Sequence, residues 1–326
     1  MAEVSMLESI RAALAYEMER DERTMILGQD VGLAGGVFRA TEGLQKRFGA
    51  DRVVDTPLAE AAIVGSSIGL AIAGRIPIAE IQFLNFSHQA FHQISDQVAR
   101  MRMRSRGRHS VPLVIRAPFG GGVRTPEMHA DSLEAKFVQS PGLKVVTPAR
   151  AEDAYGLLVS AIRDPDPVLF LEPLRGYRMV KGELPPGGHT VPFGQARVAR
   201  QGEHVTVLAW SAAVQVAERA AAAIAREGIS CTVLDLRTLV PLDEVAIQEH
   251  VARTGRVVIV HEAPLTGGFG AELIATINSV AFYSLEAPVE RVTGFDAPYP
   301  VGPLEEDYLP NERRVMNAIR KVATAP

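Results

Sequence analysis

The sequence contains a single cysteine, Cys231, among 326 residues. One cysteine can form no internal disulfide and no cysteine-rich metal site, and such usage is typical of a reducing compartment. Neither sign of charge is in large excess, because the net charge at pH 7 is only −4. The chain therefore lacks the basic excess of a nucleic-acid-binding protein, and disulfide-stabilised scaffolds are excluded as well.

Long hydrophobic runs are absent. The longest mostly apolar run, residues 61–73, is too short to span a bilayer. Near the N-terminus, Ser5 and Glu8 have the spacing of a capping box that begins an amphipathic helix reaching to about Arg20, and no secretory signal precedes it. We therefore expect a soluble, cytoplasmic protein of the bacterial type, without a targeting peptide.

Two common catalytic loops are missing, since the chain has neither a Walker loop nor a G-x-S-x-G nucleophile elbow. Short runs of Val, Ile and Leu instead alternate with helical stretches, a pattern typical of a parallel sheet covered on both faces. The predicted strands are residues 25–31, 76–83, 112–117, 144–147 and 168–171, and the predicted helices are residues 61–73, 87–103 and 152–163.

A second α/β unit follows a segment rich in proline and glycine. Its predicted strands are residues 205–210, 230–236 and 256–261, and its predicted helices are residues 212–226, 243–253, 270–282 and 311–322. The fold class is therefore α/β, with two parallel-sheet domains at residues 1–180 and 201–326 and a linker at residues 181–200.

Glu60 ends the segment D-T-P-L-A-E, residues 55–60, between a short β-branched stretch and an apolar helix. A carboxylate at the mouth of a buried helix is costly unless something binds it. The helix N-terminus favours its ionised form, whereas burial opposes ionisation. Glu60 is either a tunable acid that awaits a ligand or simply an N-terminal helix charge.

Three further stretches accompany Glu60: E-I-Q-F at residues 80–83, continuing to Phe86; G-G-G-V-R at 120–124, leading to His129; and D-P-D-P at 164–167, followed by F-L-E-P at 170–173. With them, the chain resembles the β subunit of the thiamine-diphosphate-dependent 2-oxo acid dehydrogenases over essentially all its length. The motifs H-E-A-P-L-T-G-G-F at 261–269 and L-E-A-P at 285–288 are more similar to the branched-chain members than to the pyruvate members.

This resemblance implies a first domain that binds the pyrimidine of thiamine diphosphate and a second domain similar to the C-terminal domain of transketolase. Glu60 matches the family glutamate that acts on N1′ of the pyrimidine, so that the cofactor can lose its thiazolium proton. The backbone at Leu58 and the side chain of Gln82 would hold the aminopyrimidine, and Phe86 would stack on it. His129 matches a histidine that donates a proton or stabilises charge during reductive acylation; alternatively, it is a loop histidine that only hydrogen-bonds.

The resemblance also bears on metals and partners. Some relatives bind potassium at the positions of Leu113, Val114, Ala161, Asp164 and Asp166, and an ion-free Asp-Pro-Asp-Pro turn is the alternative. The superfamily holds the diphosphate through Mg²⁺ on a Gly-Asp-Gly segment, which this sequence lacks. An α subunit is therefore expected to hold Mg²⁺ and the diphosphate, in an α2β2 heterotetramer.

With its α subunit, the chain is predicted to be a branched-chain 2-oxo acid dehydrogenase. It would decarboxylate 3-methyl-2-oxobutanoate oxidatively, in branched-chain amino acid catabolism, and acylate the lipoyl groups of a dihydrolipoyl acyltransferase core. Two alternatives stay open. One is the β subunit of a pyruvate or acetoin dehydrogenase, and the other is a non-catalytic structural subunit of the same fold.

Overall fold

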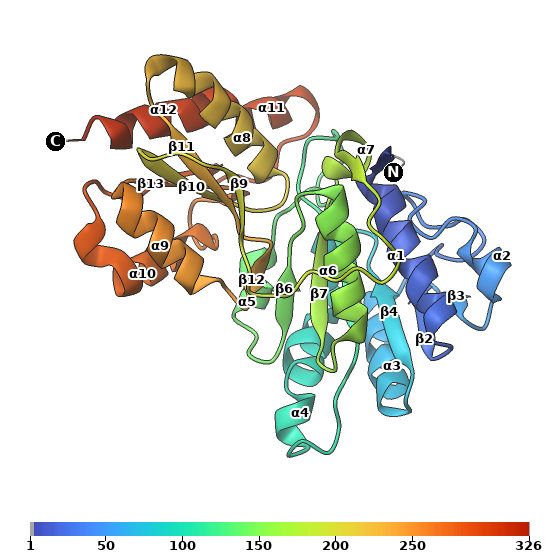
Figure 1. Cartoon of the computed structure of the whole chain (residues 1–326). Coiled ribbons are helices and arrows are strands. Elements are labelled where there is room, and N and C mark those ends of the chain that lie inside the picture. The colour runs from blue at the N-terminus through green and yellow to red at the C-terminus, as the bar shows by residue number, and fades with distance from the viewer. Residues whose placement is uncertain (1–2, 326) are drawn as a thin grey trace.

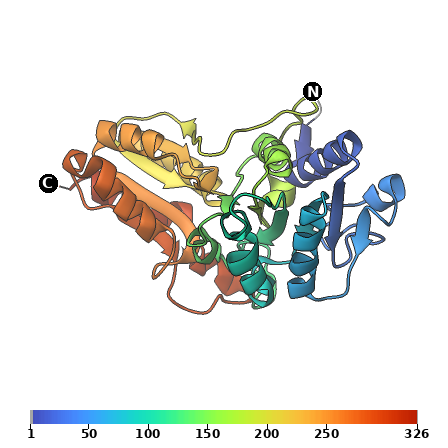
Figure 2. The same ribbon diagram turned by 90° about the horizontal axis from the view of Figure 1, so that it is seen from below.

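The computed structural model describes residues 3–325, which form two α/β domains lying side by side (Figures 1 and 2). The sheet of the first domain has the order β12-β6-β7-β5-β4-β2-β3. All its neighbouring strands are parallel except β12, which is antiparallel to β6. Its strands are β2 (Thr24–Gly28), β3 (Val53–Asp55), β4 (Ile76–Glu80), β5 (Val114–Phe119), β6 (Lys144–Val146), β7 (Val168–Pro173) and β12 (Thr238–Val240).

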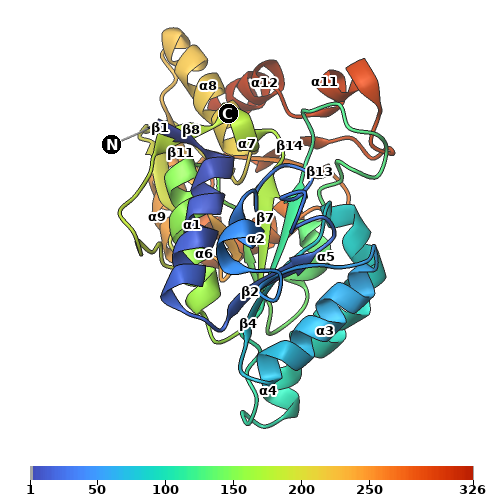
Figure 3. The ribbon, with the colours of Figure 1, turned by 90° about the vertical axis from the view of Figure 1, so that its right-hand side faces the viewer.

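Alternate residues of the central strands face opposite layers of helices. Ile78 and Phe170 belong to the core beneath α1 (Met6–Arg20) and α6 (Ala151–Arg163), whereas Ala79 and Leu171 belong to the core beneath α3 (Glu60–Ile72) (Figure 3). Because both faces are covered, β4, β5 and β7 are buried along their whole length. The domain also contains the short helices α2 (Leu44–Phe48), α5 (Glu134–Val138) and α7 (Gly176–Met179).

The N-terminal capping box is confirmed. The Ser5 side chain accepts from the backbone N–H of Glu8, and the Glu8 carboxylate accepts from the backbone N–H of Ser5 at 2.7 Å. This reciprocal pair satisfies two donors that a helix start otherwise leaves free.

The prediction of a single helix at residues 87–103 is wrong. The segment instead forms a 3₁₀ helix (Leu84–Ala90), a π helix (His92–Val98) and the short helix α4 (Met101–Arg104). The backbone N–H of Ala99 bonds to the carbonyl oxygen of Ile94, five residues earlier, and Ser95 Oγ lies 2.7 Å from Ser140 Oγ. The helical pattern of apolar residues does not specify this wider turn, because contacts with residues distant in sequence help to fix it.

The second domain has a sheet with the order β14-β13-β10-β11-β9, in which only β9 is antiparallel to its neighbour among the described strands. Helices α8 (Ala213–Ile224) and α12 (Glu312–Ala323) pack together, as do α9 (Glu244–Thr254) and α10 (Gly270–Ala281). The strands are β9 (Arg197–Arg200), β10 (Val205–Ala209), β11 (Cys231–Asp235), β13 (Val257–Pro264) and β14 (Glu290–Gly294), and the short helix α11 spans Glu305–Tyr308.

The segment predicted as a linker, residues 181–200, contains two strands. Strand β8 (Lys181–Glu183) pairs with β1 (Glu3–Ser5), and β9 joins the second sheet. Strand β12 also crosses between the domains, because it comes from the C-terminal half of the chain but extends the first sheet. The two domains are therefore connected by shared strands as well as by the chain itself. Within residues 3–325, no helix has the length and apolar character needed to cross a membrane.

Candidate active site

Glu60 is the first residue of α3 and is only 4% exposed. Its Oε2 atom has no hydrogen-bond partner in the described part of the chain. A buried carboxylate oxygen without a donor carries a desolvation cost, which a bound group able to donate a proton or a hydrogen bond would remove. The geometry therefore supports the interpretation of Glu60 as a ligand-binding acid.

Three polar residues gather where neighbouring parallel strands end. Asp30 follows β2, Glu60 follows β3 and Gln82 follows β4, and these strands are adjacent in the order β4-β2-β3. The Nε2 atom of Gln82 donates to Asp30 Oδ2 at 3.2 Å. The carboxyl edge of a parallel sheet is the usual place for ligands in such folds. Sequence reasoning missed Asp30, although it directly precedes the end of a predicted strand.

The expected pyrimidine contacts lie beside this edge. Leu58 is 64% exposed in the turn before α3, and Phe86 is half-buried on the 3₁₀ helix that follows Gln82. An exposed leucine and a partly exposed ring offer apolar surface to a planar ligand or to a partner chain. The predicted cofactor-binding residues thus come from the turn before α3 and from the segment after β4.

His129 lies against two rings of this segment. Its ring centroid is 4.5 Å from that of Phe83 and 5.1 Å from that of Phe86, both in edge-to-face geometry. Its Nδ1 atom lies 2.8 Å from the carbonyl oxygen of Glu127. Because a carbonyl only accepts, Nδ1 carries the hydrogen in the neutral ring and Nε2 is the free acceptor. The fold therefore brings His129 from a distant loop to the side of Phe86.

A buried ionic network supports the carboxyl ends of the central strands. Arg116 on β5 donates from Nε and Nη2 to the two oxygens of Glu172 at 2.8 and 2.6 Å, and from Nη1 to Glu80. Tyr177 also donates to Glu172. Burial raises the pKa of Glu80 despite Arg116, and burial together with the Glu172 charge raises the pKa of Tyr177. These contacts tie β4, β5 and β7 together just below Gln82.

A second buried cluster lies between the domains. Trp210 Nε1 donates to Glu134 Oε1 at 3.3 Å, and the ring of His261 stacks on Trp210 with 5.0 Å between centroids. Burial raises the pKa of Glu134 to about 7 and lowers the pKa of His261 to about 3. Burial therefore favours the neutral form of His261, and neither of its ring nitrogens has a hydrogen-bond partner among the described residues. Sequence reasoning did not single out Glu134 as a titratable group.

The positions predicted for potassium lie near the amino ends of β5 and β7 and the end of α6. The carbonyl oxygens of Leu113 and Ala161 already accept backbone N–H groups. The Nζ atom of Lys144 lies 2.7 Å from Asp164 Oδ1 and 3.9 Å from Asp166 Oδ2. Lys144 thus supplies the positive charge that these carboxylates need, so the residues do not require an ion. The potassium site stays a prediction, and no step below depends on it.

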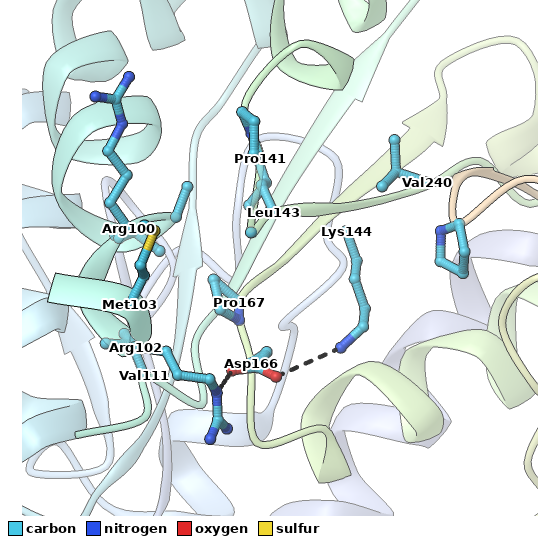
Figure 4. A pocket seen from close by; sticks show the side chains of 14 residues that line it. Arg100, Arg102, Met103, Val111, Pro141, Leu143, Lys144, Asp166, Pro167 and Val240 are labelled. Atoms are coloured by element: carbon cyan, nitrogen blue, oxygen red, sulfur yellow. Dashed lines mark hydrogen bonds and ion pairs between the residues drawn. The ribbon is translucent and has the colours of Figure 1, made fainter. Parts of the chain in front are cut away.

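A cavity of about 670 Å³ lies at this same end, near the amino ends of β5, β6 and β7. Arg102 Nε lies 2.5 Å from Asp166 Oδ1, and Lys144 approaches Asp166 from the other side (Figure 4). The remaining walls of the cavity are mostly apolar and include Met103, Leu143 and Val240. Because Glu60 and Gln82 follow the carboxyl ends of their strands, this cavity is separate from the candidate active site.

Comparison with known proteins assigns both domains. Residues 2–179 match the transketolase pyrimidine-binding domain, and residues 194–315 match the transketolase C-terminal domain. The pyruvate dehydrogenase E1 component subunit beta of Bacillus subtilis (strain 168) is 48% identical, over 99% of this chain and 99% of its own. The proteins of the same name from Acholeplasma laidlawii and Staphylococcus aureus (strain Mu50 / ATCC 700699) are 48% and 46% identical, over 100% and 98% of this chain and 99% of their own.

The chain belongs to the E1 β-subunit family of the 2-oxo acid dehydrogenases. This family depends on thiamine diphosphate, and its members act with an α subunit. A solved split gene transketolase, described as an inactive beta4 tetramer, has the same fold, with a TM-score of 0.80, 23% identity and 99% of both chains covered. The predicted fold class and family are confirmed. The expected closeness to branched-chain members finds no support, because these relatives are named for pyruvate.

Proposed function

We propose that this E1 β subunit, together with an α subunit, catalyses the oxidative decarboxylation of pyruvate and passes the acyl group to lipoyl groups of an acyltransferase. The names of the relatives that are 46–48% identical favour pyruvate over 3-methyl-2-oxobutanoate. Pyruvate therefore replaces the branched-chain substrate in the proposal. The single observation that supports catalysis is Glu60, a buried carboxylate at a helix N-terminus whose Oε2 atom has no partner among the residues that the structure describes.

Thiamine diphosphate, when bound, supplies the carbanion chemistry. In the proposal, Glu60 would face the pyrimidine ring and share a proton with a ring nitrogen through its Oε2 atom, which would remove the desolvation cost of that oxygen. Gln82, already oriented by Asp30, would hydrogen-bond the amino group of the pyrimidine, and Phe86 would cover the ring face. The Leu58 backbone would complete the contacts. The α subunit would supply Mg²⁺ and the diphosphate contacts, since this sequence has no Gly-Asp-Gly segment.

His129 is proposed to act in the transfer of the acyl group to the lipoyl arm. Its Nδ1 hydrogen is directed at the Glu127 carbonyl, which leaves Nε2 to accept or donate a proton toward the reacting centre. The rings of Phe83 and Phe86 restrict the imidazole on its apolar side. A histidine held in this way presents one nitrogen in a fixed direction.

The test is reconstitution of the tetramer with its α subunit and comparison of Glu60→Gln with wild type. We expect CO₂ release from pyruvate to fall about 10²- to 10⁴-fold, the usual contribution of a group that manages a proton in the reaction. Glu244→Gln is the matched control, because Glu244 is also the first residue of a helix but is exposed. Normal decarboxylation by Glu60→Gln would refute the assigned role.

Substrate preference is tested on the same tetramer. Pyruvate should have a kcat/KM at least about 10-fold above that of 3-methyl-2-oxobutanoate, because a pocket shaped for a methyl group discriminates by about that factor against added methyl groups. The reverse order would restore the branched-chain assignment. Thiamine diphosphate that binds the tetramer without any decarboxylation would identify a non-catalytic subunit.

A further inference from the structure

The loop that carries His129, residues 120–131, contacts the second domain at both ends, and Phe83, Asn85 and Phe86 of the first domain contact its later part. We call it the histidine loop. We propose that Glu262 and Glu305 are positioning residues, which fix the histidine loop through its backbone and so place His129 for acyl transfer. This inference rests on the role proposed for His129, but it concerns residues from the other domain.

Two carboxylates of the second domain bind backbone N–H groups at the start of the histidine loop. Glu262 on β13 accepts from the N–H of Gly121 at 2.9 Å. Glu305 on α11 accepts from Gly122 at 2.8 Å and from Arg124 at 2.9 Å, one with each oxygen. Glu305 is only 2% exposed, and Tyr299 also donates to it. Hydrogen bonds from N–H groups to carboxylates are among the stronger ones in proteins.

The glycines of the loop explain how these side chains come so close. A Cβ atom on Gly120 would lie 2.4 Å from Glu262 Oε2, and one on Gly121 would lie 1.7 Å from the Tyr299 hydroxyl oxygen. Gly122 has φ +92°, and a Cβ atom there would lie 2.6 Å from Cδ of Arg175. Side chains at Gly120 and Gly121 would push the second domain away from the loop, whereas a side chain at Gly122 would meet Arg175 of the first domain. The first two glycines are thus required by the contact between the domains.

The other end of the histidine loop is held by apolar contact with the second domain and by Asn85 of the first domain, which donates to Asp131. Ala130, next to His129, is 1% exposed and packs with Tyr299, Tyr308 and Leu309 of the second domain. Between the two anchors the chain turns sharply, and Met128 has φ +67° although it is not a glycine. A non-glycine residue persists in this conformation when its surroundings over-determine it. His129 is therefore flanked by two attachments to the second domain.

Glu305 and Glu306, neighbours on α11, contact different parts of Arg124 and so give a matched pair of variants. The backbone N–H of Arg124 bonds to Glu305, whereas its guanidinium pairs with the exposed neighbour Glu306. Glu305→Gln removes the charge that binds the backbone of the histidine loop. Glu306→Gln removes only an exposed ion pair, which contributes little in water. A difference between these two variants therefore reports on the backbone contact.

The first measurement uses the full-length chain without any activity assay. Trypsin should cut after Arg124 at least about 10-fold faster in Glu305→Gln than in wild type or Glu306→Gln, with the cut mapped by mass spectrometry. Glu262→Gln, which loses one of the three bonds, should be intermediate and serves if Glu305→Gln fails to fold. Equal cleavage in all these proteins would overturn the inference.

The second measurement uses the reconstituted tetramer. Acyl transfer from pyruvate to a lipoyl domain should fall about 10- to 10²-fold in Glu305→Gln, because a small displacement of a catalytic group has effects of this size. CO₂ release with an artificial electron acceptor should change less than about 3-fold. An equal loss in both assays would indicate general damage and contradict a positioning role. A wild-type tetramer that does not decarboxylate would refute the proposed function alone, since the cleavage result is independent of it.

Discussion

Removal of the Arg116 guanidinium should strongly destabilise the first domain. Arg116 is 1% exposed and is the positive partner of Glu80 and Glu172, which are 6% and 0% exposed. In Arg116→Met both carboxylates stay buried without a counter-charge. Breaking a buried ion pair in this way costs about 3–5 kcal/mol of unfolding free energy. For a domain of this size the melting temperature should fall by about 6–20 °C, at about 2–4 °C per kcal/mol.

The pH dependence gives this prediction a second check. Burial already raises the pKa of Glu80 in the presence of Arg116, and the loss of Arg116 should raise it further. A carboxyl group whose pKa is higher in the folded state than in the unfolded state binds more protons when folded. Its destabilising effect is therefore greatest above the folded pKa and shrinks as the pH falls. The loss of unfolding free energy in Arg116→Met, relative to wild type, should therefore be smaller at pH 5 than at pH 7.5.

Thermal unfolding followed by circular dichroism is the assay. The control is Arg102→Met, which removes a partly exposed ion pair with Asp166 and should change the unfolding free energy by about 1 kcal/mol or less. A triple variant with Glu80→Leu, Arg116→Met and Glu172→Met should regain much of the loss, because no buried charge remains. A melting temperature of Arg116→Met within about 2 °C of wild type at pH 7.5 would refute this account of the network.

Two further predictions concern buried side chains of the second domain. The pKa of His261 is about 3 in the folded state and about 6.5 when exposed, so the unfolded state binds the extra proton between these values and stability falls as the pH falls through that window. Between pH 7.5 and pH 5, the free energy of unfolding of His261→Leu should therefore fall by about 2 kcal/mol less than that of wild type, as measured by urea titration. The same pH dependence in both proteins would contradict this. Cys231 is buried and burial raises its pKa to about 12, so it should react with an aromatic disulfide reagent only in denaturant; rapid reaction of the native chain would show that β11 is exposed.

Much of the fold followed from local patterns. The apolar strands β4, β5, β7, β10 and β13 and most of the long helices were predictable, because each buries a face whose periodicity is visible in the sequence. The strands that were missed, such as β1, β8 and β12, are short and lie at sheet edges. Their pairing partners are distant in the chain, and no local pattern specifies them.

The features of the candidate site also divide into those that a local sequence pattern predicts and those that depend on tertiary contacts. The sequence by itself indicated that Glu60 lies where a strand gives way to a helix, because β-branched residues precede it and an apolar run follows it. The expectation that this whole helix is buried is wrong, since α3 buries only one face. Only the tertiary structure decided that the Oε2 atom of Glu60 has no partner within residues 3–325, that Asp30 orients Gln82 and that His129 lies beside Phe86. It also showed that carboxylates from the second domain hold the loop of His129. These contacts join residues up to 183 positions apart, and a local sequence pattern carries no information about them.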